Sequence, residues 1–288
     1  MIILENEYLR AAITPMGAEL QSLVNKATGI EHMWRGDPAF WPKFSPVLFP
    51  VVGLLKDETY YFSDQAYKLP RHGFAREKNF LVEKISDSEV IFTLTQDEHT
   101  LALYPFAFIL KLRYRLEAQT ISCSYEVENP GKKDLLFSVG AHPAFAVPFA
   151  TNSSYTDYHL AFNKPETLLR WKLKDSHLNG VTEPLPTPNN RLNLTHELFY
   201  EDAIVLKNLQ STSITVASDK HAHGIRFSFN DFPYFGIWAA KDAPFVCLEP
   251  WCGVADSTGH NQQLQYKEGM ESLAPGDAFK RTWAVECF

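Results

Sequence analysis

Three titratable side chains stand beside glycine or proline at points where an apolar run ends. They are His72 in Arg71-His72-Gly73, His142 in Ala141-His142-Pro143 and Glu249 in Leu248-Glu249-Pro250. Functional side chains favour such places, because a rigid strand positions them while the following loop leaves them accessible. An imidazole and a carboxylate can divide a proton transfer between them as general acid and general base. These three residues are therefore the first candidates for chemistry.

Each candidate also has an ordinary structural explanation. A lone histidine beside proline is more often a hydrogen-bonded structural residue than a catalyst. Glu249 directly follows the apolar run Val246-Cys247-Leu248, and burying a carboxylate is costly unless it is paired or hydrogen-bonded. A satisfied structural glutamate and a functional one are equally compatible with that position.

A metal site is a further alternative, because His72, His142, His223 and Glu249 could converge. The H-x-H spacing of His221-Ala222-His223 has no glutamate a few residues later, so we predict a surface loop with two solvated histidines. Cys247 and Cys252 are interpreted as core residues rather than zinc ligands. The sequence has no phosphate-binding P-loop, dinucleotide fingerprint or G-x-S-x-G nucleophile elbow.

Period-two alternation of apolar and polar residues dominates the chain and predicts β-strands. It is clearest in residues 110–116, 121–128, 225–230 and 279–285, and residues 135–139 form another strand-like run. Helical periodicity is weak, and only short helical pieces are plausible, at residues 195–199 and 38–41. We predict an all-β protein in which two large antiparallel sheets pack face to face as a β-sandwich.

Residues 1–288 are predicted to form a single domain. The proline-rich segment Asn179–Asn193 resembles a linker, but strand-like segments continue on both sides of it without a change in composition. We therefore expect a long surface loop there rather than a domain boundary.

Composition excludes several classes of function. The formal net charge is −7 and no basic cluster occurs, so binding to nucleic acid or to an anionic membrane is not expected. No apolar stretch approaches the ~18 residues of a membrane span, and the acidic start lacks the basic region of a signal peptide. The four cysteines show no CxxC spacing. We expect a cytoplasmic protein, monomeric or homodimeric, with reduced thiols.

Together, five segments resemble the aldose 1-epimerase (mutarotase) family, in particular its bacterial galactose-mutarotase-related branch found with lactose and tagatose pathway genes. The segments run nearly from end to end of the chain: Gly17–Leu23, Arg71–Phe74, Gly140–Phe145, Glu249–Trp251 and Leu273–Asp277. Each motif is weak alone, whereas their order and spacing are fairly specific. The resemblance implies the large galactose-mutarotase-like β-sandwich, with a sugar bound in a cleft on one sheet.

The resemblance also implies roles for individual residues. Glu249 would be the general base that takes the proton from the C1 hydroxyl, and His142 the general acid that protonates the ring oxygen. His72 would hydrogen-bond the ring oxygen or a neighbouring hydroxyl. Asp202 would be a substrate-binding carboxylate, with Glu201 as its rival, and Arg71 would bind a hydroxyl or a phosphate. The expected substrate is a hexose or hexose 6-phosphate.

The expected reaction requires a protonated acid and a deprotonated base at one pH. The pKa of an unperturbed histidine is about 6.5 and that of an unperturbed glutamate about 4.3. These values do not by themselves give the division between a protonated acid and a deprotonated base that the reaction requires. We therefore expect an ionised Glu249 to raise the pKa of His142 and partial burial to raise that of Glu249. Since mutarotation already proceeds in water, no metal and no organic cofactor is expected.

Two other functions stay open. A sugar-binding or sugar-sensing protein of the same fold would use the same hydroxyl-binding groups without turnover. A glycoside hydrolase or lyase would need a second carboxylate opposite Glu249, for which Asp202 is the only evident candidate. A phosphorylated substrate would require cations at the cleft, and the candidates are Arg35, Lys56, Arg71 and Arg76. Phe145, Trp238 and Trp251 are candidates to pack against a sugar ring or to belong to the core.

Overall fold

The computed structural model describes residues 1–288, and its largest element is a nine-stranded antiparallel sheet. In spatial order its strands are β15 (Arg191–Asn193), β12 (Tyr158–Phe162), β17 (Ser213–Ser218), β18 (His221–Ser228), β22 (Ala278–Cys287), β9 (Thr120–Glu128), β8 (Ile109–Glu117), β7 (Glu89–Thr95) and β6 (Leu81–Ser86). The longest predicted strands fall in its centre, as β8, β9, β18 and β22.

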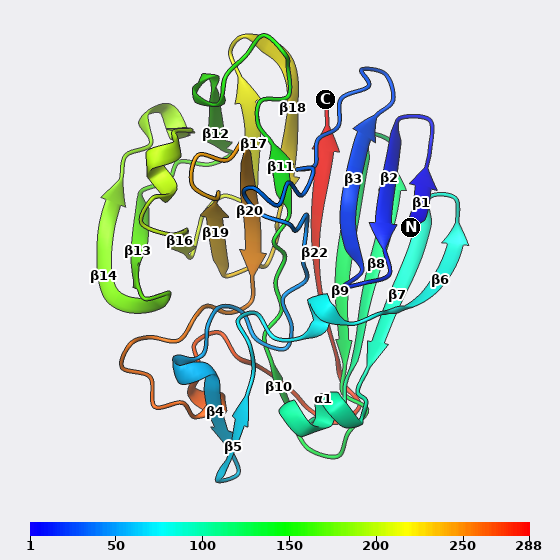
Figure 1. The fold of residues 1–288 in the computed structure, drawn as a ribbon, viewed down its shortest axis with the longest axis vertical. Helices are drawn as coiled ribbons and strands as arrows, with labels where there is room; N and C mark the ends of the chain where they lie inside the picture. Colours follow the sequence, from blue (N-terminus) through cyan, green and yellow to red (C-terminus); the bar gives the residue numbers. More distant parts are fainter.

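Two further antiparallel sheets lie in front of the nine-stranded sheet (Figure 1). The six-stranded one contains, in order, β11 (Ala144–Ala146), β20 (Phe245–Trp251), β19 (Tyr234–Trp238), β16 (Ile204–Lys207), β13 (Leu168–Lys174) and β14 (His177–Leu185). The three-stranded one contains β1 (Ile2–Glu5), β2 (Leu9–Thr14) and β3 (Glu19–Asn25). The predicted all-β sandwich is confirmed.

The remaining elements are small. Two strand pairs are formed by β4 (Thr59–Phe62) with β5 (Gln65–Lys68) and by β10 (Leu135–Phe137) with β21 (Glu271–Leu273). The α-helix is α1 (Glu98–Leu103), and the 3₁₀ turns are Lys56–Glu58, Ala75–Glu77, Tyr155–Asp157, Pro188–Asn190, His196–Phe199 and Leu264–Tyr266. No helix is both long and apolar enough to cross a membrane.

The helical predictions were partly wrong. The piece expected at residues 195–199 exists as a 3₁₀ turn, whereas residues 38–41 form no helix. Helix α1 was missed because it has only six residues, too few for a periodic pattern. It begins with a capping box, in which the Asp97 carboxylate accepts from the Thr100 N–H and the Thr100 hydroxyl accepts from the Asp97 N–H.

Alternation decides which side chains form the core. In β8, Leu110, Leu112 and Tyr114 are at most 1% exposed and point between the layers, while the intervening basic residues do not. The sheets share one cluster of 68 buried residues. Aromatic contacts join the layers, because Phe235 of β19 packs on Phe227 of β18 with ring centroids 6.2 Å apart.

The same alternation gives the six-stranded sheet an outer face. Phe235 points to the nine-stranded sheet and pairs in register with Pro250, so its neighbours Gly236 and Glu249, also paired, point to the opposite side. Glu249 therefore lies on the face turned away from the main core. Chain segments near residues 48–56, 71–76 and 251–256 cover this face.

Two loop predictions were wrong. Much of the segment 179–193 belongs to β14, where Pro184 is tolerated because β14 is the edge strand of its sheet. His221 and His223 lie in β18 and are half-buried, not in a solvated loop. The Tyr158 hydroxyl hydrogen-bonds the His221 ring at 2.7 Å, which fixes that histidine in the strand.

Candidate active site

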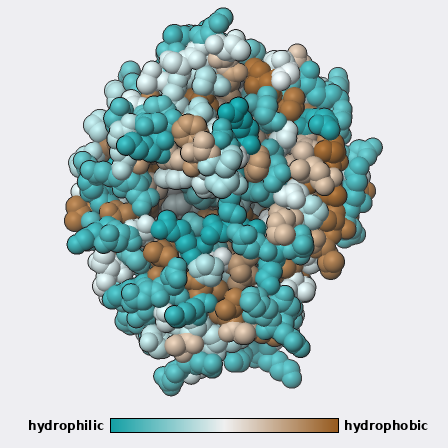
Figure 2. Space-filling model, viewed as in Figure 1, coloured by the Kyte–Doolittle hydropathy of each residue, from teal (hydrophilic) through white to brown (hydrophobic).

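A cavity of about 360 Å³ opens on the outer face of the six-stranded sheet, within the range of about 300–1,000 Å³ that is usual for small-molecule sites. Figure 2 shows a hollow on this face, surrounded largely by hydrophilic side chains. The five residues proposed from the sequence all line the cavity: His72, His142, Glu249, Arg71 and Asp202.

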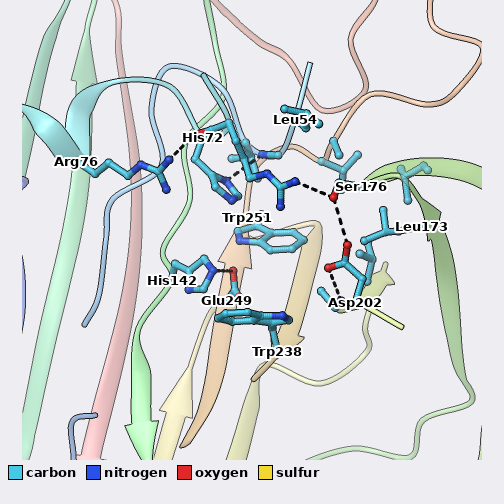
Figure 3. A pocket seen from close by; sticks show the side chains of 18 of the residues that line it. Leu54, His72, Arg76, His142, Leu173, Ser176, Asp202, Trp238, Glu249 and Trp251 are labelled. Atoms are coloured by element: carbon cyan, nitrogen blue, oxygen red, sulfur yellow. Dashed lines mark hydrogen bonds and ion pairs between the residues drawn. The ribbon is translucent and has the colours of Figure 1, made fainter. Parts of the chain in front are cut away.

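The innermost polar group of the cavity is the pair His142 and Glu249. The His142 Nε2 and Glu249 Oε2 atoms are 3.1 Å apart, and the residues are 9% and 1% exposed. In Figure 3 the imidazole faces the carboxylate, with Trp238 on one side of Glu249 and Trp251 on the other. The sequence places these residues 107 positions apart, so tertiary structure brings the acid and base together.

Backbone pairing explains how His142 reaches β20. The Ala141 N–H donates to the Pro250 carbonyl, and the Leu248 N–H donates to the Pro143 carbonyl. Gly140 makes this approach feasible, because a Cβ there would lie 2.7 Å from Cδ1 of Trp251. The segment Gly140-Ala141-His142-Pro143 is therefore held along β20 at the level of Glu249.

His72 enters the cavity from a strained turn. Its φ is +67°, in the left-handed region that non-glycine residues seldom adopt. The next residue, Gly73, has φ +69°, and a Cβ there would lie 2.3 Å from the Phe49 carbonyl oxygen. The Gly53 N–H donates to Nδ1 of His72 at 3.1 Å, so a neutral His72 carries its proton on Nε2. The ring is thereby a hydrogen-bond donor.

A polar chain lies at the other side of the cavity (Figure 3). Arg71 Nη2 donates to the Ser176 hydroxyl at 2.7 Å, and this hydroxyl lies 3.4 Å from Asp202 Oδ2. Asp202 has φ +93°, and its Oδ1 accepts from the Ala203 N–H at 2.8 Å. Strained backbone is concentrated at functional sites in many proteins, and both His72 and Asp202 show it.

The cavity keeps its deepest groups uncharged. Burial lowers the pKa of His142 to about 3 and that of His72 well below its usual value. Burial, together with the Asp202 carboxylate, raises the pKa of Glu249 well above its usual range. Both shifts favour the uncharged forms of His142 and Glu249, and because the two groups are in contact their titration belongs to the pair.

The expected effect of Glu249 on His142 was wrong in direction. The pKa of His142 falls instead of rising, because burial disfavours the imidazolium and the positive charge of Arg76 lowers the pKa further. The expected increase in the pKa of Glu249 agrees with the structure. Sequence could not show how completely both groups are buried.

Aromatic side chains form much of the remaining wall. Trp41 stacks on His142 with ring centroids 4.9 Å apart, and Trp238 meets the same ring edge-on at 5.7 Å. Trp238 and Trp251 line the cavity, whereas Phe145 packs on Phe227 inside the sandwich. Trp41 was missed as a site residue, because nothing in its local sequence indicates that it contacts His142.

Some of the remaining candidate residues line the cavity and others do not. Arg76 lines the cavity, while Arg35 is exposed beside Asp37 and Lys56 does not line it. Glu201 pairs with Lys172 at 2.9 Å on the surface, so Asp202 and not Glu201 faces the cavity. Ser176 was also missed, because its place in the site depends on contact with Arg71, which lies 105 residues earlier.

One group of side chains has the composition of a metal site. The ligand atoms of His142, Cys247 and Glu249 all lie within 4.8 Å of one another. His72 and His223 do not belong to this group. The structure therefore does not bring His72, His142, His223 and Glu249 together as one metal site.

Comparison with known proteins agrees with this architecture. The family profile described as aldose 1-epimerase matches residues 1–271. Protein LacX of Lactococcus lactis subsp. lactis is 31% identical over 294 residues, covering 99% of this chain and 98% of that protein.

Two solved structures are similar over almost their whole length. A galactose mutarotase-like protein from Lactobacillus casei is 37% identical, with a TM-score of 0.94 and full coverage of both chains. A galactose mutarotase related enzyme from Lactobacillus acidophilus is 31% identical, with a TM-score of 0.95, covering 99% of this chain and 96% of that one. The chain belongs to the aldose 1-epimerase family.

Proposed function

We propose that this protein is an aldose 1-epimerase that interconverts the α and β anomers of a hexose or hexose 6-phosphate. The observation that carries the proposal is the buried contact of 3.1 Å between His142 Nε2 and Glu249 Oε2 on the wall of the cavity. A matched acid and base is what ring opening needs, and simple sugar binding does not require one. Membership of the family and the mutarotase-like neighbours support the same reaction.

The reaction begins when a sugar hydroxyl hydrogen-bonds the Glu249 carboxylate. Such a bond favours the ionised form, so the carboxyl proton of Glu249 moves to Nε2 of His142. Glu249 then takes the proton of the C1 hydroxyl as the bond between C1 and the ring oxygen breaks. His142 gives its proton to that oxygen, which becomes the C5 hydroxyl. The product is the open-chain aldehyde.

Rotation about the C1–C2 bond exposes the opposite face of the aldehyde, and the same proton transfers in reverse close the ring. The Nε2–H of His72 is available to hydrogen-bond the ring oxygen while charge develops there. Each well-placed proton-transfer group contributes on the order of 10²–10⁴-fold. No cofactor enters these steps.

The opposite end of the cavity would hold the remaining hydroxyls. Asp202 accepts hydrogen bonds, Arg71 donates them, and Ser176 can do both. Arg71 and Arg76 are the two guanidinium groups on the wall, and guanidinium binds phosphate oxygens in a bidentate manner. These residues support a phosphorylated hexose as one of the two substrate classes.

Anomer exchange measured by NMR tests this function. Exchange of glucose, galactose and their 6-phosphates is followed with and without the protein, and sugar binding is measured in parallel. We expect exchange well above the buffer rate for at least one sugar. Saturable binding with exchange at the buffer rate would instead establish a sugar-binding or sugar-sensing protein.

A further inference from the structure

Cys247 shares the outer face of the six-stranded sheet with Glu249. The two residues are separated by one position in β20, so their side chains point to the same side. Register supports this placement, because Cys247 pairs with Trp238 and Glu249 pairs with Gly236, and Trp238 lines the cavity. The thiol therefore lies beside the acid–base pair.

The donor atoms of this group are close together and incompletely satisfied. Cys247 Sγ, a ring nitrogen of His142 and a Glu249 carboxylate oxygen lie within 4.8 Å of one another. His142 Nδ1 is buried without a hydrogen-bond partner, Glu249 Oε2 contacts the His142 ring at 3.1 Å, and Cys247 is a free thiol. Zinc bonds of about 2.0–2.3 Å in a tetrahedron separate the ligand atoms by about 3.3–3.8 Å, so shifts of about 1 Å complete the geometry.

We propose that His142, Cys247 and Glu249 form an inhibitory site for Zn²⁺ and similar thiophilic divalent cations. The cation would enter through the cavity and bind Nε2, Sγ and the carboxylate, with water or a sugar hydroxyl as fourth ligand. The thiol proton, and the proton held by the pair, leave to solvent as the metal bonds form. The metal then occupies the atoms that transfer protons to the sugar.

The surroundings favour an inhibitory site over a resident cofactor. A metal-binding histidine normally donates its other ring N–H to an acceptor that orients it, but Nδ1 of His142 has no such partner. Affinity should therefore be weaker than that of a structural zinc site. The expected loss of activity on metal addition rests on the proposed function, whereas metal binding can be tested independently of it.

Cobalt spectroscopy of the full chain tests the site directly. After treatment with chelator and its removal, Co²⁺ is titrated into the wild-type protein and into Cys247→Ser. Cys252→Ser is the matched control, because Cys252 is also buried but does not belong to the group. We expect a thiolate-to-cobalt charge-transfer band in the wild type and in Cys252→Ser, and none in Cys247→Ser.

Zinc binding is then measured by calorimetry, and anomer exchange is measured at increasing Zn²⁺. Loss of a residue that only orients a metal ligand costs about 10–100-fold in metal affinity. Loss of the thiolate ligand itself should therefore reduce the affinity for Zn²⁺ by at least about 100-fold. Cys247→Ser should keep its metal-free activity and become resistant to zinc. Thermal unfolding, together with Cys247→Ala as a second variant, identifies any folding defect.

Two results would overturn the site. One is the absence of a cobalt–thiolate band in the wild type, and the other is unchanged Zn²⁺ affinity in both folded Cys247 variants. A protein without mutarotation that still binds Zn²⁺ through Cys247 would overturn the proposed function but keep the metal site. The two proposals can therefore fail separately.

Discussion

At the scale of single residues, burial controls the protonation of the cavity. His142 and Glu249 are removed from water together, and each is shifted toward its uncharged form. The 3.1 Å between His142 Nε2 and Glu249 Oε2 is short enough for a proton to pass from one residue to the other. A bound sugar therefore has an acid and a base available without any change in net charge of the pair.

Glu249→Gln and His142→Asn should each abolish most of the anomer exchange. Glu249→Gln keeps the shape of the side chain and His142→Asn leaves a smaller polar group, and each removes a group that exchanges protons, so we expect the kcat to fall by about 10²–10⁴-fold. The measurement is NMR or polarimetric mutarotation, with thermal unfolding as the control for folding. Wild-type rates in both variants would reject the assigned roles.

His32 should make the protein sensitive to acid. It is fully buried near Phe149, neither ring nitrogen has a hydrogen-bond partner, and burial lowers its pKa to about 4. Because the unfolded chain binds the proton more readily between pH 6.5 and 4, stability falls as pH decreases through this window.

His32→Leu should remove that dependence. The wild type should lose about 2 kcal/mol of unfolding free energy through His32 between pH 7 and pH 5, and the variant should lose correspondingly less. Urea unfolding at both pH values is the measurement, with the half-buried His177 replaced by leucine as control. An equal loss in His32→Leu and the wild type would contradict the prediction.

At the scale of elements, Asp256 joins three segments beside the cavity, two through its carboxylate and one through its backbone. Asp256 accepts from the Lys56 N–H at 2.9 Å and from Lys267 Nζ at 3.1 Å. Its N–H donates to the Leu54 carbonyl, and its carbonyl accepts from the Leu178 N–H. Leu54 and Leu178 both line the cavity. The wall thus depends on a charge pair behind it.

Asp256→Asn should destabilise the fold and loosen the cavity. It leaves the Lys267 charge buried without its counter-ion, which typically costs about 3–5 kcal/mol. We expect a higher KM, a smaller effect on kcat, and partial recovery of stability in the double variant Asp256→Asn with Lys267→Met. Asp219→Asn, which breaks an exposed pair with Arg191, should cost less than about 1 kcal/mol. Equal effects in Asp256→Asn and Asp219→Asn would disprove this role.

Gly73 should be essential to the turn that presents His72. Gly73 and Gly29 have similar φ values of +69° and +70°, but only at Gly73 would a Cβ meet backbone. Gly29→Ala should therefore cost only about 1–2 kcal/mol for the left-handed conformation. Gly73→Ala should cost more and should also reduce mutarotation. Denaturant titration and activity assays compare the two variants. If Gly73→Ala were as stable as Gly29→Ala and fully active, the steric argument would be refuted.

At the scale of the whole molecule, the layers share one interior and the site lies outside it. The nine-stranded sheet faces the other two across the 68-residue core. The cavity is on the outer side of the six-stranded sheet, where a smaller cluster around Trp251 supports it. Polar site residues therefore do not interrupt the main core.

A single shared core should give one cooperative unfolding transition. Tryptophan fluorescence reports on six residues spread over the chain, and far-ultraviolet circular dichroism reports on the sheets. The two probes should give coincident curves, with calorimetric and van't Hoff enthalpies in agreement. Separate transitions would show that residues 1–288 do not fold as one domain.

Local pattern alone determined much of the fold. Alternation over residues 110–116 and 121–128 places one set of side chains in the core, because strand side chains alternate whatever their neighbours are. The segments around His72, His142 and Glu249 were recognisable because each combines a titratable group with glycine or proline at the end of an apolar run. Segment 179–185 was misjudged because Pro184 and the prolines that follow it resemble a loop, and only the place of β14 at a sheet edge permits Pro184 in a strand.

Tertiary structure alone decided how the site works. The contact of Trp41 with His142, the bond of Arg71 to Ser176 and the approach of Cys247 to the acid–base pair all join residues whose proximity no local pattern encodes. The direction of the pKa shift in His142 also depends on burial, which results from packing. Residue types specify what chemistry is available, whereas sheet packing sets the distances and the dielectric environment in which that chemistry occurs.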